Sequence, residues 1–281
     1  MVFLQKKEEM VLFPKAKINL GLSITGKRPD GFHNIETIFY PINICDALEF
    51  VEADFADKSD LLTVTGIETG SSPEDNLVLK AVKLLRAKWS FPALKIHLHK
   101  AIPAGAGLGG GSSDASFMLK AVNRHYWLDI SNEELRSMAL SLGSDCPFFL
   151  DCEPSFARGR GELLKPLNLD LSKYYLVLLN PGIGINTREA YQNCRPASPL
   201  FDLNNIEKVS IKEWKNILFN DFEGYVFGKH PVIGQLKEGL YQAGALFSLM
   251  SGSGSSVYGI FEQKPALPVN LTDYMIWEGP M

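Results

Sequence analysis

Hydrophobic and polar residues alternate in several stretches of the first half of the chain. This period of two is typical of strands that pack one face against a core. The alternation is clearest from Lys17 to Thr25, where the apolar residues are Ile18, Leu20, Leu22 and Ile24. Extended patterns of the same kind cover residues 35–42, 47–52, 61–67 and 93–100. The pattern therefore predicts a strand in each of these five stretches.

A different spacing, with apolar residues every three or four positions, covers residues 76–88 and 115–126. This is the spacing of an amphipathic helix, so a helix is expected in both stretches. A further helix is expected from Ser131 to about Gly143, because Ser131 and Glu134 have the spacing of a capping box.

In the second half, residues 156–167 predict a hairpin, and the continuous apolar run at residues 174–179 predicts a buried strand. The final pattern, residues 246–260, indicates two strands joined by a Ser/Gly loop. Helices are expected at about residues 187–193, 211–218 and 232–243.

Strands therefore dominate the start of the chain and helices cluster later. This order favours an α+β fold with mixed or antiparallel sheets and helices packed on them. A length of 281 residues suits two domains. We expect the first at residues 1–155 and the second at residues 156–281, since the second half begins near Ser155.

The most distinctive stretch is residues 103–116, where five glycines fall within seven positions. Glycines let a backbone approach a ligand closely and adopt positive φ. A predicted strand precedes them, and the hydroxyls of Ser112 and Ser113 and a predicted helix follow. Backbone N–H groups and the positive end of a helix dipole then converge on one place. The stretch predicts a phosphate-binding loop.

Two better-known phosphate loops do not fit. Gly105, Gly107 and Gly110 match the dinucleotide pattern G-x-G-x-x-G, but that motif requires a parallel strand after the helix. A helix beginning at Ser131 is expected there instead. The Walker pattern, which ends in Gly-Lys-Ser/Thr, is absent from the sequence. The interpretation as a dehydrogenase is therefore disfavoured.

Composition excludes some partners. The net charge of −4 and the lack of a Lys/Arg stripe argue against nucleic-acid binding, and no apolar run is long enough for a membrane span. Residues 1–10 carry four charges and no apolar core, which predicts no signal peptide. The four cysteines lack CxxC spacing, so reduced thiols in a cytoplasmic enzyme are expected.

Phosphoryl transfer also needs a cation and a carboxylate near the phosphate loop. Lys17 and Asn19 are two positions apart on a predicted strand, so both side chains point to one face. Asp145 lies between the helix-ending Gly143 and an apolar Cys-Pro-Phe-Phe run. An acid in such surroundings needs a partner, and a lysine is the natural one.

Three blocks of the sequence resemble the motifs of the GHMP kinase superfamily: residues 17–20, residues 103–116 and residues 251–256. Residues 28–33, the form Gly-Gly-Gly-Ser-Ser-Asp-Ala and residues 143–147 are similar to the members that act on a cytidine-diphosphate-linked methylerythritol. The resemblance spans nearly the whole chain, about residues 13–261.

The resemblance implies a two-domain fold with a cleft between the domains, an ATP-binding domain first and a domain that contributes to the substrate site second. It implies ATP-dependent phosphorylation of the 2-hydroxyl of the acceptor, on the methylerythritol phosphate route to isoprenoids. Asp145 would be the base and Lys17 its catalytic partner. Mg²⁺ would lie near Ser112 or Ser113. The residues implied at the nucleotide are Asn76, Lys100, Pro103, Ala104, Gly105, Ala106, Gly107, Leu108, Gly109, Gly110, Gly111, Ser112 and Ser113.

At the cytidine end the resemblance points to His33, with Phe32 stacking on the base. Phe32 departs from the family, in which tyrosine is usual beside that histidine. Tyr191, four residues after Thr187 on the same helical face, is expected as the opposing aromatic. Asn19 and Thr187 complete the expected substrate residues. A monomer or homodimer remains open.

Two alternatives remain open on the residues alone. One is another small-molecule kinase of the superfamily, acting on homoserine, mevalonate or a sugar. The other is a nucleotide-binding regulator without catalysis, which would be expected to lack either Lys17 or Asp145.

Overall fold

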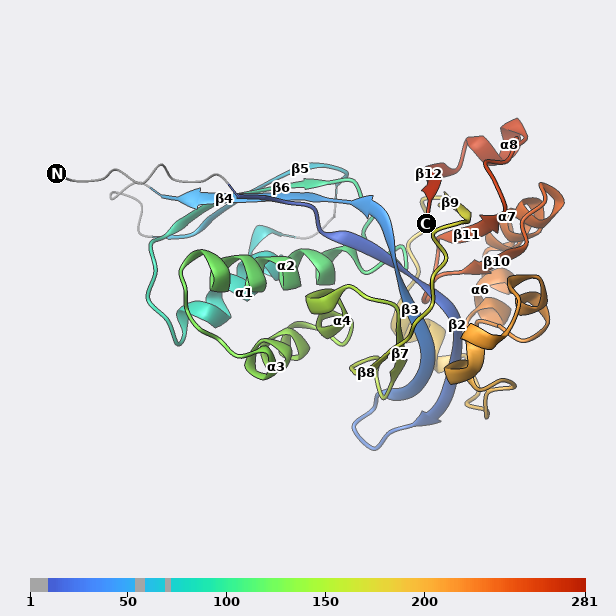
Figure 1. Cartoon of the computed structure of the whole chain (residues 1–281), viewed down its shortest axis with the longest axis horizontal. Helices are drawn as coiled ribbons and strands as arrows, with labels where there is room; N and C mark the ends of the chain where they lie inside the picture. The colour runs from blue at the N-terminus through green and yellow to red at the C-terminus, as the bar shows by residue number, and fades with distance from the viewer. Residues whose placement is uncertain (1–9, 54–58, 69–71) are drawn as a thin grey trace.

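The computed structural model describes residues 10–53, 59–68 and 72–281. Within these residues the chain forms three four-stranded sheets (Figure 1). Residues 1–9, in which no signal peptide is expected, lie outside the described part.

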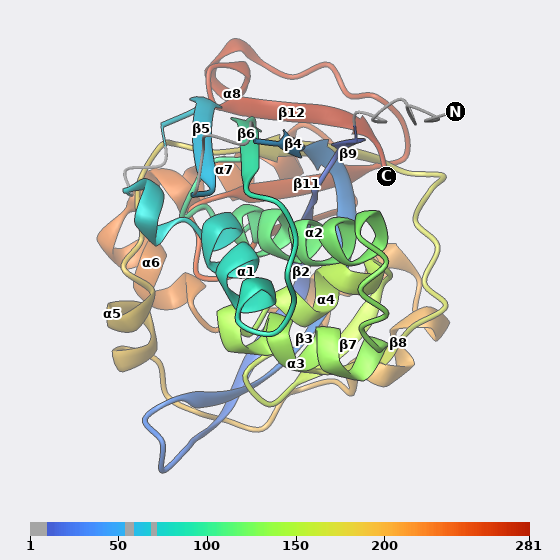
Figure 2. The ribbon, with the colours of Figure 1, turned by 90° about the vertical axis from the view of Figure 1, so that its left-hand side faces the viewer.

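The first sheet has the strand order β1-β4-β6-β5, with β5 parallel to β6 and the other neighbours antiparallel. Helices α1 and α2 lie side by side against one face of it, and α3 and α4 follow beyond them (Figures 1 and 2). Apolar residues of the sheet and of these helices form one core. The elements are β1 (Met10–Leu12), β4 (Ala47–Glu52), β5 (Leu61–Gly66), β6 (Leu94–Lys100), α1 (Leu77–Arg86), α2 (Gly110–His125), α3 (Asn132–Leu142) and α4 (Cys146–Asp151).

The other two sheets are antiparallel and pack face to face. Ile18, Leu20 and Ile38 of one meet Leu178 and Tyr258 of the other in a second core. One sheet has the order β2-β3-β7-β8 and the other β10-β11-β9-β12. The strands are β2 (Lys15–Lys27), β3 (His33–Cys45), β7 (Ser155–Arg158), β8 (Leu163–Pro166), β9 (Tyr175–Leu179), β10 (Phe247–Met250), β11 (Val257–Phe261) and β12 (Met275–Pro280).

Short helices cover the outer face of the β10-β11-β9-β12 sheet. Residues of α5, α6, α7 and α8 share a third apolar core with Val177, Leu179 and Val257 of this sheet. The helices are α5 (Thr187–Gln192), α6 (Glu223–Lys229), α7 (Pro231–Gln242) and α8 (Val269–Thr272), and 3₁₀ turns occur at Pro73–Asp75, Leu203–Lys208 and Ile211–Asn216.

This architecture confirms the expected α+β class with mixed and antiparallel sheets. The helix predicted at residues 211–218 is instead a 3₁₀ helix at Ile211–Asn216. Its two buried residues, Ile211 and Trp214, are three positions apart, the repeat of a 3₁₀ turn. Helix α4 was not predicted. The boundary expected between residues 155 and 156 falls within β7, a strand that pairs with β3.

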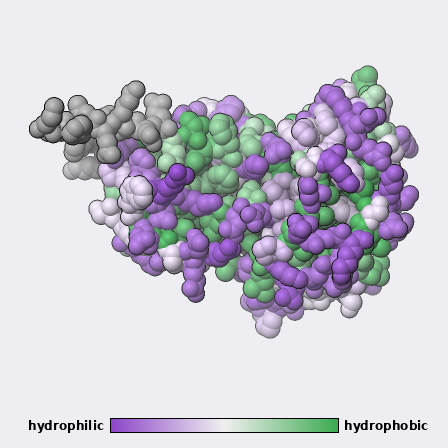
Figure 3. Space-filling view, in the orientation of Figure 1, coloured by the Kyte–Doolittle hydropathy of each residue, from purple (hydrophilic) through white to green (hydrophobic). Residues whose placement is uncertain are grey.

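Two further features of the molecule are its surface and its cysteines. Hydrophilic residues cover most of the face in Figure 3, with smaller hydrophobic areas between them. No helix in the described part of the chain has the length and apolar character needed to cross a bilayer. The four cysteines are free.

Candidate active site

Strand β2 delivers a buried lysine to the centre of the molecule. Lys17 is 3% exposed, and its ammonium group donates to Asn19 Oδ1 at 2.6 Å and to the Gly107 carbonyl at 3.0 Å. Asp145 Oδ2 lies 3.5 Å from Lys17 Nζ. Burial lowers the pKa of Lys17, and the charge of Asp145 opposes that shift. The predicted pairing of Lys17 with Asp145 is present, and Asn19 lies on the same face as expected.

Asp145 comes from a tight turn that the sequence only partly indicates. It directly precedes α4, which carries Pro147 near its start, and its side chain is one-third exposed. Phe148 and Phe149 of α4 are fully buried against Phe39. The apolar helix therefore anchors the turn, while the carboxylate remains open to a ligand.

The glycine-rich loop joins β6 to α2, as the sequence predicts. Gly105, Gly107 and Gly109 have φ of 63°, 79° and 72°, which L side chains rarely adopt. A Cβ on Gly107 would collide with the Ser251 carbonyl oxygen. Gly109 caps α2 with no side-chain hydrogen bond, so the N-terminus of this helix has no capping side chain. These features suit binding of an anion.

The Ser/Gly loop at residues 251–256 closes against the glycine-rich loop. Ser251 Oγ donates to the Gly107 carbonyl at 2.9 Å, and the Ser256 N–H donates to the Ala106 carbonyl at 3.2 Å. Tyr258 donates its hydroxyl proton to the Asn19 carbonyl at 2.7 Å. Three segments distant in the sequence thus meet at one place.

Two cavities open beside this centre. The first has a volume of about 850 Å³ and includes Phe32, His33 and Tyr191 in its wall. The second has a volume of about 470 Å³, and its wall includes Lys17, Asn19 and most of the glycine-rich loop. Four residues line both cavities: Asp145, Arg160, Thr187 and Tyr191. The carboxylate of Asp145 therefore lies where the two cavities meet.

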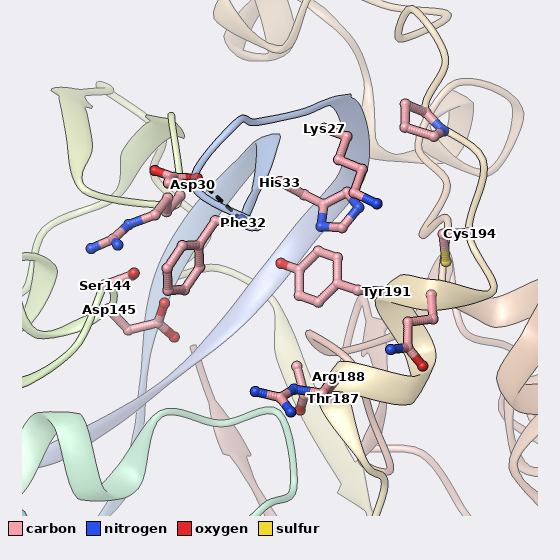
Figure 4. Close-up of a pocket in the computed structure, with 14 residues that line it drawn as sticks. Lys27, Asp30, Phe32, His33, Ser144, Asp145, Thr187, Arg188, Tyr191 and Cys194 are labelled. Atoms are coloured by element: carbon pink, nitrogen blue, oxygen red, sulfur yellow. Dashed lines mark hydrogen bonds between the residues drawn. The ribbon is translucent and has the colours of Figure 1, made fainter.

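Three aromatic rings line the first cavity. The rings of His33 and Tyr191 are stacked, with centroids 4.9 Å apart. Phe32 is 52% exposed and lies across the opening from Tyr191 (Figure 4). Burial raises the pKa of Tyr191 to about 12. Aromatic rings on both sides of the opening suit the binding of a flat heterocycle.

Thr187 links this cavity to the Ser/Gly loop, because its hydroxyl lies 2.9 Å from that of Ser253. Thr187 is the first residue of α5, which also carries Tyr191. The expected substrate residues Asn19, Phe32, His33, Thr187 and Tyr191 all line one or both cavities.

Four of the residues expected at the nucleotide do not line these cavities. The Asn76 side chain caps α1 by accepting from the Val78 N–H at 2.9 Å. Lys100 is buried behind the loop and forms ion pairs with Asp46 and Asp114. Leu108 and Ser113 are fully buried. Those that do line the second cavity are Pro103, Ala104, Gly105, Ala106, Gly107, Gly109, Gly110, Gly111 and Ser112.

Sequence reasoning overlooked several cationic residues of the first cavity: Lys27, Arg160 and Arg188. Arg160 belongs to the Arg-Gly-Arg-Gly stretch, which the sequence indicates only as part of a hairpin. The local signal available in the sequence is the position of Arg160 between two glycines, Gly159 and Gly161, which indicates a turn.

The arrangement combines a glycine-rich loop at a helix N-terminus, a buried cation and a carboxylate at the junction of two cavities. Such a set can hold two substrates and bring a hydroxyl of one to a phosphate of the other. Asp145 is placed to accept the hydroxyl proton, and Lys17 to stabilise negative charge.

Comparison with known proteins yields consistent matches. The family model "GHMP kinases N terminal domain" matches residues 76–152, and "GHMP kinases C terminal" matches residues 203–268. The chain is 51% identical over 259 residues to a 4-diphosphocytidyl-2-C-methyl-D-erythritol kinase from Bacteroides thetaiotaomicron, covering 92% of this chain and 94% of that one.

A protein of the same name from Parabacteroides distasonis is 49% identical over 274 residues, with 97% and 100% of the two chains covered. A crystal structure of a 4-(cytidine 5'-diphospho)-2C-methyl-D-erythritol kinase superposes with a TM-score of 0.75 at 34% identity, covering 89% of this chain and 90% of that one. The similarity thus extends over nearly the whole length in both sequence and fold.

Proposed function

The chain belongs to the 4-diphosphocytidyl-2-C-methyl-D-erythritol kinases, within the GHMP kinases, and from this premise we propose that it transfers the γ-phosphoryl group of ATP to the 2-hydroxyl of 4-diphosphocytidyl-2-C-methyl-D-erythritol. The product belongs to the methylerythritol phosphate route to isoprenoid precursors. The observation that carries the proposal is the position of Asp145, paired with Lys17 where the two cavities meet.

The second cavity is the proposed site of the ATP phosphates. Backbone N–H groups of the loop and the start of α2 offer donors to phosphate oxygens. Because a Cβ on Gly107 would collide with Ser251 and one on Gly109 with Phe149, both glycines let the loop pack closely around that space. In this assignment the buried Lys17 stabilises charge on the transferred group, since a cation in a water-poor site acts more strongly than one in bulk water.

The first cavity is the proposed site of the cytidine. Stacking between Phe32 and Tyr191 would hold the base, and the ring nitrogens of His33 would offer a hydrogen bond to its edge. The acceptor then extends toward Asp145. In a loose transition state the hydroxyl proton leaves late, so we expect Asp145 to act mainly by positioning the hydroxyl.

Mg²⁺ fits this arrangement as a bound ion. Among the described residues no group of three or more His, Cys, Asp or Glu is arranged around one point. Mg²⁺ commonly takes one or two protein oxygens together with substrate phosphates. Ser112 lines the second cavity beside the turn of Asp145, whereas Ser113 is buried. We therefore propose Ser112 as the hydroxyl nearest the ion, whose chemistry is to neutralise phosphate charge.

The same proposal gives each of the two domains a role and the protein a location. Residues 1–155 would supply the ATP site, and residues 156–281 would contribute α5 and the Ser/Gly loop to the substrate site. The four free cysteines support a cytoplasmic location.

The decisive experiment measures ATP-dependent transfer onto 4-diphosphocytidyl-2-C-methyl-D-erythritol, with mevalonate and homoserine as parallel acceptors. We expect transfer to the cytidyl acceptor alone. Asp145→Asn should lower kcat by about 10²- to 10⁴-fold, the usual contribution of a positioned acid or base. Asp151→Asn is the matched control, because Asp151 ends the same helix and pairs with Arg136 at the surface.

Transfer to mevalonate or homoserine would replace the proposed acceptor with another. Binding of ATP without transfer to any acceptor would favour a nucleotide-binding regulator. Full activity of Asp145→Asn would exclude Asp145 as the base while leaving the kinase assignment intact.

A further inference from the structure

Arg160 occupies the wall between the two cavities. It lines both of them, as Asp145 does, whereas Lys27 and Arg188 line only the first. It lies on the turn between β7 and β8, next to Gly161. A Cβ on Gly161 would lie 3.5 Å from Asp145 Oδ1, so this turn passes directly beside the Asp145 carboxylate.

The backbone of this turn is held firmly. The Gly161 N–H donates to the Arg158 carbonyl at 3.0 Å, and the Ile35 N–H donates to the Gly159 carbonyl at 2.7 Å. The Arg160 N–H donates to a carboxylate oxygen of Glu162. The Arg160 side chain therefore starts from a fixed point, which reduces the entropy lost when it binds a ligand.

The guanidinium group of Arg160 is held against a ring and has no carboxylate partner among the described residues. Its carbon lies 4.5 Å from the centroid of Phe32, the ring proposed to stack on the base. Asp30, the acidic residue of this cavity wall besides Asp145, is bound by Arg28 at 3.0 Å. The bond from Arg28 is the main cause that lowers the pKa of Asp30, and the charge of Arg160 also lowers it, but less. A partly buried guanidinium without an ion pair is available for an anionic ligand.

We propose that Arg160 binds phosphate oxygens of the acceptor's diphosphate and so determines specificity for diphosphate-linked acceptors. This inference rests on the proposed function. With the base beside Phe32 and the hydroxyl beside Asp145, the diphosphate between them must pass the wall that Arg160 forms. Guanidinium suits this task, because its planar fork binds two phosphate oxygens at once.

The alternative source of phosphate is ATP, which would bind in the second cavity. One observation and one consequence of the proposed assignment favour the acceptor. Arg160 contacts Phe32, which lines the first cavity and not the second. The ATP phosphates already have the N–H groups of the glycine-rich loop and Lys17 as partners in the proposed assignment.

The test compares the affinities of CDP and cytidine by titration calorimetry in the wild-type chain and in Arg160→Gln. We expect the wild type to prefer CDP. In Arg160→Gln the affinity for CDP should fall by about 10- to 100-fold, the size expected for lost hydrogen bonds to a charged group. The affinity for cytidine should change much less. Arg160→Lys keeps the charge without the fork and should fall between the two.

Arg158→Gln is the matched control, because Arg158 is exposed on the same hairpin and lines neither cavity. It should keep the wild-type preference for CDP. A non-hydrolysable ATP analogue should bind Arg160→Gln with wild-type affinity, which also verifies that the variant is folded. If Arg160→Gln fails to fold, the same comparison is made with Arg160→Lys, whose preference for CDP over cytidine should be weaker than that of the wild type.

An unchanged preference for CDP in Arg160→Gln would overturn the inference, and so would equal affinities for CDP and cytidine in the wild type. Weakened binding of the ATP analogue with CDP unaffected would assign Arg160 to ATP instead and overturn it as well. These results leave the proposed function in place if the wild type phosphorylates the cytidyl acceptor. Absence of that transfer would contradict the proposed function itself.

Discussion

Lys17 combines deep burial with a charge that the fold does not fully neutralise. Its ammonium group has two oxygen acceptors within 3.0 Å, and Asp145 lies at 3.5 Å. Burial nevertheless lowers its pKa, so the folded state disfavours the charged form relative to the unfolded chain. A residue kept at such a cost is more readily explained by catalysis than by stability.

We predict that Lys17→Met lowers the transfer rate by at least about 10²-fold, the loss typical of one stabilising charge or donor. The free energy of unfolding at pH 7 should stay unchanged or rise, because the buried charge is removed. The wild type should become more stable as the pH rises between the lowered pKa and the ordinary lysine value, since the unfolded chain then binds more protons. Any stability advantage of the variant should therefore shrink in that range.

Lys15→Met provides the control, because Lys15 lies two positions earlier on β2 and bonds to Asn43 away from the site. It should retain activity. Denaturant unfolding at several pH values, together with kcat, measures both effects. A Lys17→Met protein that is markedly less stable at pH 7 would show that Lys17 serves the fold rather than the reaction.

At the scale of elements, the glycine-rich loop and the Ser/Gly loop form one closed contact. Gly105 and Gly107 both have positive φ, but only Gly107 faces another backbone. A Cβ on Gly107 would collide with the Ser251 carbonyl, whereas one on Gly105 would meet no atom within 4 Å. A substitution at Gly105 therefore tests backbone strain alone, whereas one at Gly107 tests strain together with loss of the contact between the loops.

We predict that Gly105→Ala lowers the free energy of unfolding by about 1 kcal/mol, the cost of a left-handed conformation for an L residue. Gly107→Ala should cost distinctly more and should also weaken ATP binding, because the two loops must move apart. Denaturant unfolding and titration with an ATP analogue measure the two effects. Equal losses in both variants would show that the contact with Ser251 contributes nothing to the site.

The elements that the sequence predicts well are those whose signals are local. The β6–loop–α2 unit depends on alternation, glycines and helical spacing within about thirty residues. Ser131 caps α3 as its spacing indicates, with its Oγ accepting from the Glu134 N–H at 3.2 Å, whereas the Glu134 side chain pairs with Lys88. Helix α4 escaped prediction because its residues Cys146–Leu150 are all buried. Such a short and uniformly apolar run has no periodicity to detect.

The residues of the candidate site also divide into those that the local sequence indicates and those that it does not. The pairing of Lys17 with Asp145 could be anticipated because an acid beside an apolar run is expected to need a partner, although in the structure Lys17 is the buried member and Asp145 is one-third exposed. The burial of Lys100 and the position of Arg160 could not, since both depend on contacts between segments far apart in the sequence. Asp46 and Lys100, for example, are 54 positions apart. Nothing in the neighbourhood of Arg160 indicates which ring it will meet.

For the molecule as a whole, a buried charge cluster joins the first sheet to the glycine-rich loop. Lys100 at the end of β6 lies between Asp46 and Asp114, and all three are nearly inaccessible to solvent. Asp46 Oδ1 also accepts from the N–H groups of Ala101 and Ile102, at 2.6 and 2.9 Å, where the loop begins. The sheet, the loop and α2 therefore depend on one electrostatic cluster.

The cluster holds two carboxyl groups and one ammonium group, so full ionisation would leave an excess negative charge in the interior. Oδ1 of Asp114 has no hydrogen-bond partner among the described residues. Burial raises the pKa of Asp114 to about 7, with Lys100 opposing the shift. Asp114 is therefore one of the groups through which the stability of the fold responds to pH.

We predict that the free energy of unfolding contains a component that falls as the pH rises from about 4 to about 7 and that is absent in Asp114→Asn. In this range the folded chain holds a proton on Asp114 that the unfolded chain has released, so raising the pH favours unfolding by up to about 1.4 kcal/mol per pH unit. Denaturant unfolding at several pH values should show the difference between wild type and Asp114→Asn shifting in favour of the variant. Asp151→Asn, at an exposed carboxylate, should follow the wild type. Parallel pH profiles for the wild type and Asp114→Asn would mean that Asp114 is ionised throughout, with Lys100 sufficient to hold both acids.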